Sequence, residues 1–471
     1  MLNLFRTKSV DKMLQNSEEG GQHKLKRALN AFDITIMGIG AIIGAGIFVL
    51  TGTAAATHAG PGIILSFVFT GVACAFTALC YAEFASMIPI AGSAYTYSYA
   101  TMGELIAWII GWDLILEYAV GACAVSIGWS SYFVDFLKKF FNIDFPVAFS
   151  MAPNLIPGTT TYINLPAVLI ILAMTALLVI GIKESAKFNN VVVVIKILII
   201  CFFLYVGAVI IKINPANWKP FMPFGWHGVM AGAALVFFAY IGFDSVTTTA
   251  EEAKKPQRDL PIGIIASLVI CTVLYVAVAA VLTGITHYTK LNNPAPIAVA
   301  LIEAGKAKLS GIVSVGAVVS LLSTMLVMLM AQPRIFFAMS RDGLLPQGLS
   351  KVHKKFGTPY ITTIATGLVV AAAAGFGNIQ TVAELCNIGT LFAFVLVCAG
   401  IIVLRHTKPD LKRPFKCPAV PLIPILGALS CIYLMCSLPL TTWIRFIVWM
   451  LIGIVIYFLY GARNSKIGKE P

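Results

Sequence analysis

The sequence predicts an all-α integral membrane protein with twelve transmembrane helices, and three observations support this fold class. Of the 471 residues, 59% are apolar and 11% are charged, whereas a soluble domain is about 45–50% apolar and about 25% charged. Continuous apolar runs such as 165–182 and 191–211 match the roughly 20 residues that cross a bilayer as a helix. These runs lack the apolar–polar alternation of transmembrane β-strands, so a soluble globule and a membrane barrel are both excluded.

Twelve apolar runs account for the predicted helices in chain order. Residues 1–30 before them are polar and lack the apolar core of a signal peptide, and residues 462–471 form a short tail. The predicted spans are 31–57, 63–88, 104–136, 165–182, 190–212, 229–250, 261–285, 310–340, 360–376, 381–404, 420–438 and 443–461.

Lysine and arginine predict how these spans are oriented. If the N-terminus is cytoplasmic, 23 of the 33 Lys and Arg residues lie on the cytoplasmic side and eight on the outer side, the other two being Lys196 and Arg334 within spans. Cytoplasmic loops carry an excess of these residues, so both termini are predicted to be cytoplasmic, in a cell membrane. The net charge of +13 then reflects topology, and a nucleic-acid partner is not expected.

Two of the predicted spans differ from the others because each is interrupted. Four glycines fall within residues 38–46 of the first span, and each weakens a helix by about 1 kcal/mol relative to alanine. Gly242 and Asp244 interrupt the sixth span. We predict a helix break in both spans. The alternative for Gly40 and Gly44 is a helix-packing motif; a dinucleotide fingerprint is rejected because it needs a preceding strand and a later acidic residue.

The spacing of the interrupted spans predicts an inverted repeat and a binding site. They are five spans apart, and because five is odd, two successive five-helix units are upside down relative to each other. Interrupted helices at matching positions of two halves indicate a transporter binding site. Freed amides at helix N-termini suit a carboxylate and freed carbonyls suit an ammonium group, and an amino acid carries both.

Three longer motifs extend this interpretation: residues 238–244 (FAYIGFD), 251–257 (EEAKKPQ) and 332–346 (QPRIFFAMSRDGLLP). Together with the glycine-rich first span they resemble the amino acid–polyamine–organocation superfamily, specifically bacterial relatives of cationic amino acid transporters. The resemblance runs from about residue 28 to 460. It implies a five-plus-five inverted repeat of leucine-transporter type and proton-coupled import of amino acids. The implied parts are 1–30, the repeats 31–212 and 229–404, two added helices in 420–461, and the tail 462–471.

The resemblance also implies which residues bind substrate. Amides near Ala45 and Gly46 resemble a cradle for the carboxylate, several nearby carbonyls resemble ammonium partners, and the Phe238 ring resembles an outer lid. Family members commonly have Thr or Ser at the position of Ala45, so a backbone contact rather than a hydroxyl contact is expected there. The implied substrate-binding residues of the two breaks are Ile42, Ile43, Gly44, Ala45, Gly46, Phe238, Ala239 and Ile241.

Lys196 is the candidate for proton coupling. It lies about 12 Å deep in the fifth span at 1.5 Å per residue, and a charge near the bilayer centre costs roughly 2.5–3.5 kcal/mol. This cost disfavours the charged form of the lysine, so Lys196 can gain or lose its proton near neutral pH. In the resembled family a lysine stands where sodium-coupled relatives bind sodium, so we expect its ammonium to bridge spans one and eight. The alternatives are a permanent ion pair and snorkelling to the inner interface.

Other charged residues within or near the spans have less specific predictions. Asp113 and Glu117 share a helix face; Asp113 is expected to be a structural partner, and Glu117 to line the site or relay charge to Lys196. Asp244 is expected to cap the freed helix end or join an inner gate. Four residues near cytoplasmic helix ends are expected to be anchors or gate salt bridges, namely Glu83, Glu251, Glu252 and Arg334.

Met328 predicts the type of substrate. In cationic amino acid carriers of the resembled family the matching position is similar to a serine, and methionine offers no comparable hydrogen bond to a guanidinium. A small or medium neutral amino acid such as alanine is therefore favoured. The alternative is that Met328 only fills the core.

Competing functions and cofactors are constrained by what the sequence lacks. No nucleophile–base cluster or metal-ligand spacing is present, the ten cysteines contain no CxxC pair, and the polar rings of a symmetric channel are missing. Neither an enzyme nor a metal site is expected, and no cofactor other than the proton as coupling ion. A polyamine or cationic amino acid exchanger remains the nearer alternative, and a non-accumulating receptor or channel the more remote one; the oligomeric state is not predicted.

Overall fold

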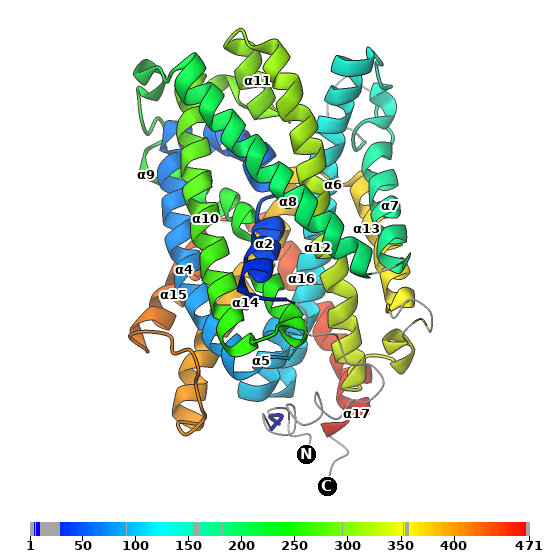
Figure 1. The fold of residues 1–471 in the computed structure, drawn as a ribbon. Helices are drawn as coiled ribbons and strands as arrows, with labels where there is room; N and C mark the ends of the chain where they lie inside the picture. Colours follow the sequence, from blue (N-terminus) through cyan, green and yellow to red (C-terminus); the bar gives the residue numbers. More distant parts are fainter. Residues whose placement is uncertain are drawn as a thin grey trace.

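The protein is an all-helical bundle whose long helices run side by side in the computed structural model (Figure 1). The described residues are 4, 6–9, 29–90, 92–153, 160–180, 182–293, 295–351, 353 and 358–467, without the side chains of 139, 182–188, 251 and 252. Among these residues the only β-pairing is an isolated bridge between Leu29 and Ala253.

Eight helical segments of the described chain are long and apolar enough to cross a membrane. They are Gly46–Met87, Glu104–Lys138, Asn189–Ile211, Gly225–Ala250, Pro256–Ile285, Ala307–Arg341, Ile379–Thr407 and Leu440–Asn464. Four shorter apolar helices accompany them, namely α2 (Ala31–Ile42), α7 (Leu165–Ile180), α13 (Tyr360–Phe376) and α15 (Leu422–Cys436). The multi-pass membrane protein predicted from composition is confirmed.

The remaining helices connect or continue these segments. Three short ones, α5, α11 and α17, lie outside the predicted spans, and Figure 1 shows α5 at the lower end of the bundle and α11 at the upper end. The helices are α3 (Thr51–Ala54), α4 (Ile63–Met87), α5 (Ser93–Thr101), α6 (Glu104–Phe141), α8 (Ile182–Tyr205), α9 (Gly225–Val236), α10 (Pro256–Ile285), α11 (Pro296–Glu303), α12 (Ala307–Arg341), α14 (Ile379–Thr407), α16 (Leu440–Ile456) and α17 (Ala462–Asn464).

Both predicted helix breaks are present. Helix α2 ends at Ile42, the chain is extended at Ile43 (φ −73°, ψ 102°), and a π-helix resumes at Gly46–Leu50. Helix α9 continues as a 3₁₀ helix to Tyr240, and the chain is extended at Ile241 (φ −62°, ψ 136°) before helix resumes at Asp244–Glu252. The two breaks leave backbone amides and carbonyls outside regular helices.

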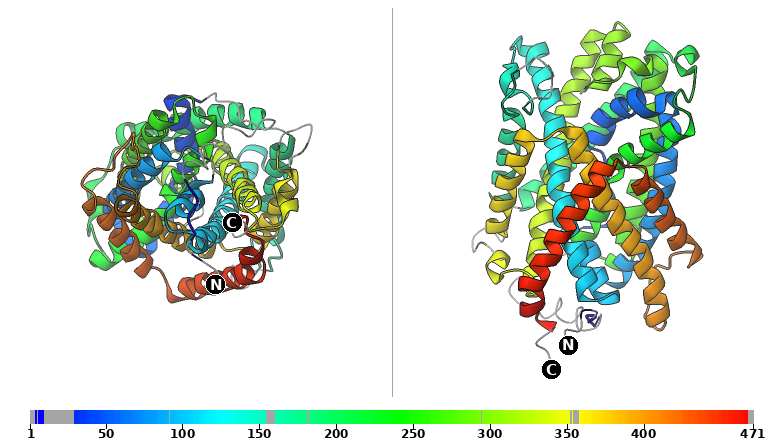
Figure 2. Two further views of the ribbon diagram at one scale, coloured as in Figure 1. Left: turned by 90° about the horizontal axis from the view of Figure 1, so that it is seen from below. Right: turned by 180° about the vertical axis from the view of Figure 1, so that it is seen from behind.

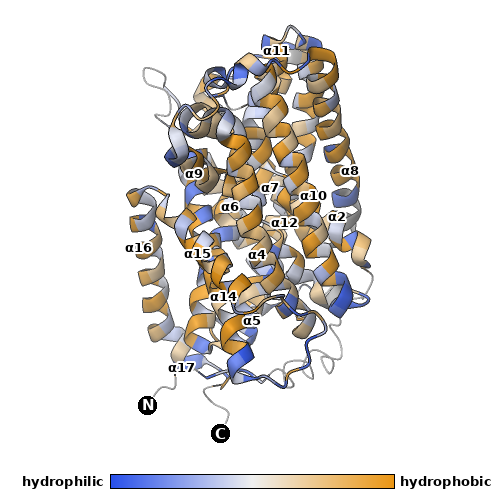
Figure 3. Cartoon of the chain, turned by 90° about the vertical axis from the view of Figure 1, so that its left-hand side faces the viewer, coloured by the Kyte–Doolittle hydropathy of each residue, from blue (hydrophilic) through white to orange (hydrophobic). Residues whose placement is uncertain are grey.

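The outer face of the bundle is apolar, as a bilayer requires. Figure 3 shows hydrophobic residues along the outward faces of the helices, including α16, which stands at the periphery in Figures 2 and 3. Leu198, Val273 and Leu451 are 62%, 63% and 56% exposed. A soluble monomer rarely exposes contiguous apolar patches larger than a few hundred Å², so lipid is the environment that covers this belt.

Candidate functional site

The candidate site lies where the two helix breaks meet. A Cβ atom added to Gly46 would lie 2.3 Å from the Cα atom of Ala239, and one added to Gly242 would lie 2.9 Å from the carbonyl atoms of Ala41. Gly242 also has a φ of +120°, which L side chains rarely adopt. Gly46 and Gly242 therefore allow the two broken segments to touch. The same glycines that interrupt the helices also make this close packing possible.

Helix α10 ties the two breaks to each other through one side chain. The hydroxyl of Tyr275 lies 2.9 Å from the carbonyl oxygen of Ile42 and 2.8 Å from that of Ala239. A phenol has one hydrogen, so it donates to one of these carbonyls at a time. Tyr275 was not among the predicted site residues, although a polar aromatic side chain within the apolar run 261–285 marks it in the sequence.

The first break leaves donors without backbone partners. The amide nitrogens of Gly44 and Ala45 form no backbone hydrogen bond with a described residue. They stand just before the π-helix at Gly46–Leu50, where unpaired amides carry partial positive charge. This is the region predicted to hold a carboxylate, and Ala45 is fully buried there.

Lys196 of α8 also contacts the first break. Its ammonium nitrogen lies 2.9 Å from the carbonyl oxygen of Gly40 and 2.6 Å from the hydroxyl of Ser323, and it also donates to the carbonyl of Ile43. The side chain is fully buried and forms no ion pair with a described residue. It therefore joins α2 to α12, the bridge expected between spans one and eight.

Thr324 duplicates part of this bridge. Its hydroxyl lies 2.7 Å from the carbonyl oxygen of Ile43, 3.0 Å from that of Gly40 and 3.3 Å from the Lys196 nitrogen. A Cβ atom on Gly44 would lie 2.8 Å from Cγ2 of Thr324, so α12 packs directly against the break. The adjacent hydroxyls Ser323 and Thr324 were missed by the sequence analysis.

Three carboxyl groups form a buried acidic cluster beside the breaks. Asp113 and Glu117 come from α6 and Asp244 from the second break, and all are at most 1% exposed. The hydroxyl of Tyr118 lies 2.8 Å from Oδ2 of Asp244, and the other five carboxyl oxygens have no partner among the described residues. The acids interact electrostatically through Glu117, and no group of metal ligands is found in the described chain.

Met328 faces the same side of α6 as Glu117. A Cβ atom added to Gly121, one turn beyond Glu117, would lie 2.6 Å from Sδ of Met328 and 3.4 Å from Sγ of Cys386. Met328 is 2% exposed, and Phe238 of the second break is 4% exposed. The predicted site residues are thus brought together in the bundle interior and closed to solvent.

Two other predicted charges, Glu83 and Arg334, have described partners. Glu83 accepts hydrogen bonds from Arg405 at 2.7 and 3.1 Å and lies 3.3 Å from Arg413, so the expected salt bridge is present. Arg334 lies 3.4 Å from the hydroxyl of Thr248. The side chains of 251 and 252, the two predicted glutamate anchors, lie outside the described residues.

Comparison with known proteins identifies related chains. Residues 29–461 match the family model described as amino acid permease. The Branched-chain amino acid permease BcaP of Bacillus subtilis (strain 168) is 52% identical over 467 residues, covering 99% of both chains. The Methylthioribose transporter of the same organism is 50% identical over 469 residues, covering 100% of both chains. The vacuolar Cationic amino acid transporter 4 of Arabidopsis thaliana is 41% identical over 418 residues, covering 87% of this chain and 68% of the relative.

Proposed function

Because this chain belongs to the amino acid permease family, we propose that it is a proton-coupled amino acid symporter that works by alternating access across the cell membrane. The observation that carries the proposal is the contact between the two helix breaks at Gly46–Ala239 and Gly242–Ala41. A zwitterion needs amide donors and carbonyl acceptors close together, and broken helices are the backbone arrangement that supplies both within a membrane.

The proposal includes a fold of twelve membrane crossings built as two inverted five-helix repeats, 31–212 and 229–404, with two added helices. The two broken segments support it, because α2 and α9 each have 12 residues before the backbone leaves the α-helix. The distribution of Lys and Arg supports cytoplasmic termini.

The substrate carboxylate binds the amides of residues 44–46, and the substrate ammonium binds carbonyls of both breaks. The partners available to the ammonium include the carbonyls of Ile42 and Ala239, which share the single hydroxyl hydrogen of Tyr275. One of these two carbonyls is therefore without that hydrogen bond at any moment, and it is ready to accept from a ligand. The Phe238 ring covers the substrate from the outer side.

Lys196 couples this site to the proton gradient. When protonated, its three donors hold the carbonyls of α2 against α12 and keep the broken helix in place. When the proton leaves to the cytoplasm, the charge–dipole attraction is lost, and only neutral hydrogen bonds, which are weaker, still hold the first break to α12, among them those of Ser323 and Thr324. Helix α2 then moves away from α12, which opens the site inward and releases the substrate.

We propose a neutral amino acid as the substrate, either small, such as alanine, or branched-chain as in the name of one relative. The thioether of Met328 supports this choice, because it provides no strong acceptor for a guanidinium. A second candidate is methylthioribose, because a relative of equal length and 50% identity is named for transporting it. That sugar has neither a carboxylate nor an ammonium group, so it would not use the amide cradle.

Uptake into proteoliposomes tests the proposal. Labelled alanine, leucine, arginine and methylthioribose are supplied with and without an inward proton gradient. We expect gradient-dependent accumulation of a neutral amino acid, with arginine and methylthioribose at background. Accumulation of methylthioribose alone would select the second candidate, and uptake that needs amino acid inside the vesicles, with no effect of the gradient, would identify an exchanger instead of a symporter.

A further inference from the structure

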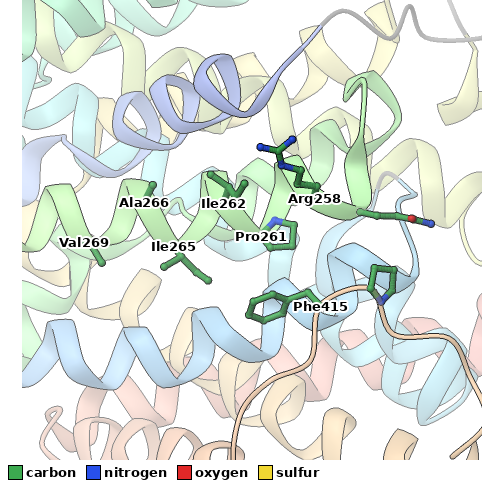
Figure 4. A pocket seen from close by; sticks show the side chains of 9 residues that line it. Arg258, Pro261, Ile262, Ile265, Ala266, Val269 and Phe415 are labelled. Carbon is green, nitrogen blue, oxygen red and sulfur yellow. The ribbon is translucent and has the colours of Figure 1, made fainter.

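A groove of about 710 Å³ is lined by residues of α10 and of the segment after α14, and none of them belongs to the candidate site (Figure 4). One wall is the face of α10 that carries Ile262, Ile265, Ala266 and Val269, and the other wall is formed by Phe415 in the segment after α14. Ile262 is 41% and Val269 55% exposed, so the groove faces the lipid belt and not the substrate path.

The second wall of the groove is held rigidly. The backbone amide of Phe415 donates to the hydroxyl of Ser86 at 3.2 Å, and that of Cys417 donates to the Glu83 carboxylate at 2.7 Å. Glu83 is fully buried and also binds Arg405. The groove is therefore preformed, because hydrogen bonds to α4 hold the segment around Phe415 beside α10.

The groove is basic at one end and apolar along the rest of its length. Arg258 lies at one end and is exposed, and its guanidinium forms no ion pair or hydrogen bond with a described residue. Exposed lysines surround the same end of the bundle, at positions 254 and 255 before α10 and 412 and 416 beside Phe415. From Arg258 to Val269 the groove follows eleven residues of α10, or about 16 Å at 1.5 Å per residue, and half the hydrocarbon thickness of a bilayer is about 15 Å.

We propose that this groove binds an anionic phospholipid of the leaflet on the Lys- and Arg-rich side. One acyl chain lies along Ile262, Ile265, Ala266 and Val269 against Phe415, and the phosphate pairs with Arg258. Three features together match a lipid: an apolar channel one leaflet long, a guanidinium at its polar end that has no partner among the described side chains, and a basic surface that attracts anionic headgroups. The proposal rests on membrane insertion only, so it is independent of the substrate and of proton coupling.

Native mass spectrometry of the detergent-purified full chain tests this site, with phosphatidylglycerol and phosphatidylcholine titrated separately. We expect phosphatidylglycerol to be retained about fivefold better, the effect of roughly one favourable basic contact at a membrane surface. Arg258→Gln removes the preference and leaves chain binding, whereas Ala266→Trp fills the groove and lowers retention of both lipids.

Two matched variants control for charge and for bulk. Lys308→Gln removes an exposed cation outside the groove, and Val273→Trp enlarges an exposed lipid-facing residue of α10 that does not line it; both should bind like the parent. Equal retention of the two lipids, a preference that survives Arg258→Gln, or displacement of lipid by inorganic phosphate at similar concentration would each overturn the proposal. Thermal unfolding of each variant checks that it is folded, and proteoliposome uptake is scored separately so that a failure of transport is not confused with a failure of binding.

Discussion

At the scale of single residues, Lys196 is notable because its partners are all uncharged. Its nitrogen contacts carbonyl oxygens of α2 and hydroxyls of α12, and it has no described carboxylate partner. A buried charge held only by dipoles is stabilised less than one in an ion pair. The alternative of a permanent ion pair finds no partner for Lys196 among the described residues.

Replacing Lys196 with alanine should abolish proton-driven accumulation and preserve exchange. The substrate contacts proposed at the breaks are made by backbone atoms, so binding should survive, while the protonatable bridge is lost. Proteoliposomes carrying Lys196→Ala should therefore show counterflow of labelled substrate but no response to an inward proton gradient. Ser323→Ala is the matched control, because it removes one hydroxyl partner and keeps the amine. Full gradient-driven uptake by Lys196→Ala would refute the coupling role.

The carboxylates of α6 should differ in their effect on transport. Glu117 lies one turn from Gly121 and Met328, whereas Asp113 lies against Gly389 of α14, whose added Cβ would be 2.7 Å from Oδ1. We expect Glu117→Gln to raise the KM of uptake about tenfold, the loss of one interaction of about 1.4 kcal/mol. Asp113→Asn should leave KM within about twofold. Equal KM values for both variants would show that Glu117 does not line the site.

Met328 should determine whether a guanidinium is accepted. The side chain is buried against the α6 face, and serine at this position supplies a hydroxyl and space. Competition of labelled alanine uptake by arginine is expected to appear in Met328→Ser and to be absent from the parent. Met328→Leu, which conserves volume without a hydroxyl, serves as the control and should remain insensitive to arginine. Strong arginine competition in the parent would contradict the preference for a neutral substrate.

At the scale of helices, the breaks were predictable and their partners were not. The four glycines within 38–46 and the interruption at Gly242 and Asp244 are local signals, because glycine and aspartate both destabilise a helix interior. Tyr275 and Thr324 contact the first break from residues more than 230 positions away. Periodicity carries no information about which distant hydroxyl meets which carbonyl, so these contacts required the three-dimensional arrangement.

Substituting Gly46 should show whether stability and transport need the close contact between the two breaks. In Gly46→Ala the added methyl would lie 2.3 Å from the Cα atom of Ala239, so backbone must shift at the contact between the breaks. Overpacking of this kind costs about 1–3 kcal/mol, and we expect a lowered unfolding temperature together with loss of uptake. Gly348→Ala is the control, because nothing lies within 4 Å of its added Cβ. Parental uptake by Gly46→Ala would show that the two breaks need not touch.

At the scale of the whole molecule, the candidate site is closed to solvent. Contacts that were not predicted from the sequence also hold the helices together at one end of the bundle. Lys8 pairs with Asp342 at the end of α12, and the hydroxyl of Tyr95 donates to the same carboxylate at 2.8 Å. The amide of Lys8 also donates to the carbonyl of Tyr99 at 3.0 Å. Residues 6–9 thereby join α5 to α12, while the helix breaks lie in the interior. Alternating access requires such fastenings to open without unfolding the helices they connect.

Removing this fastening should loosen α5 selectively. Lys8→Met keeps the side-chain length and removes the cation that pairs with Asp342. Because a weaker tertiary contact lowers the free energy of local opening, the amides of Ser93–Thr101 should exchange hydrogen with solvent several-fold faster. The matched control is Lys290→Met, which breaks the exposed pair with Glu303 and should leave exchange in α5 unchanged. If α5 is protected equally in Lys8→Met and the parent, the contact does not close this end; faster exchange combined with faster substrate counterflow would identify it as part of an inner gate.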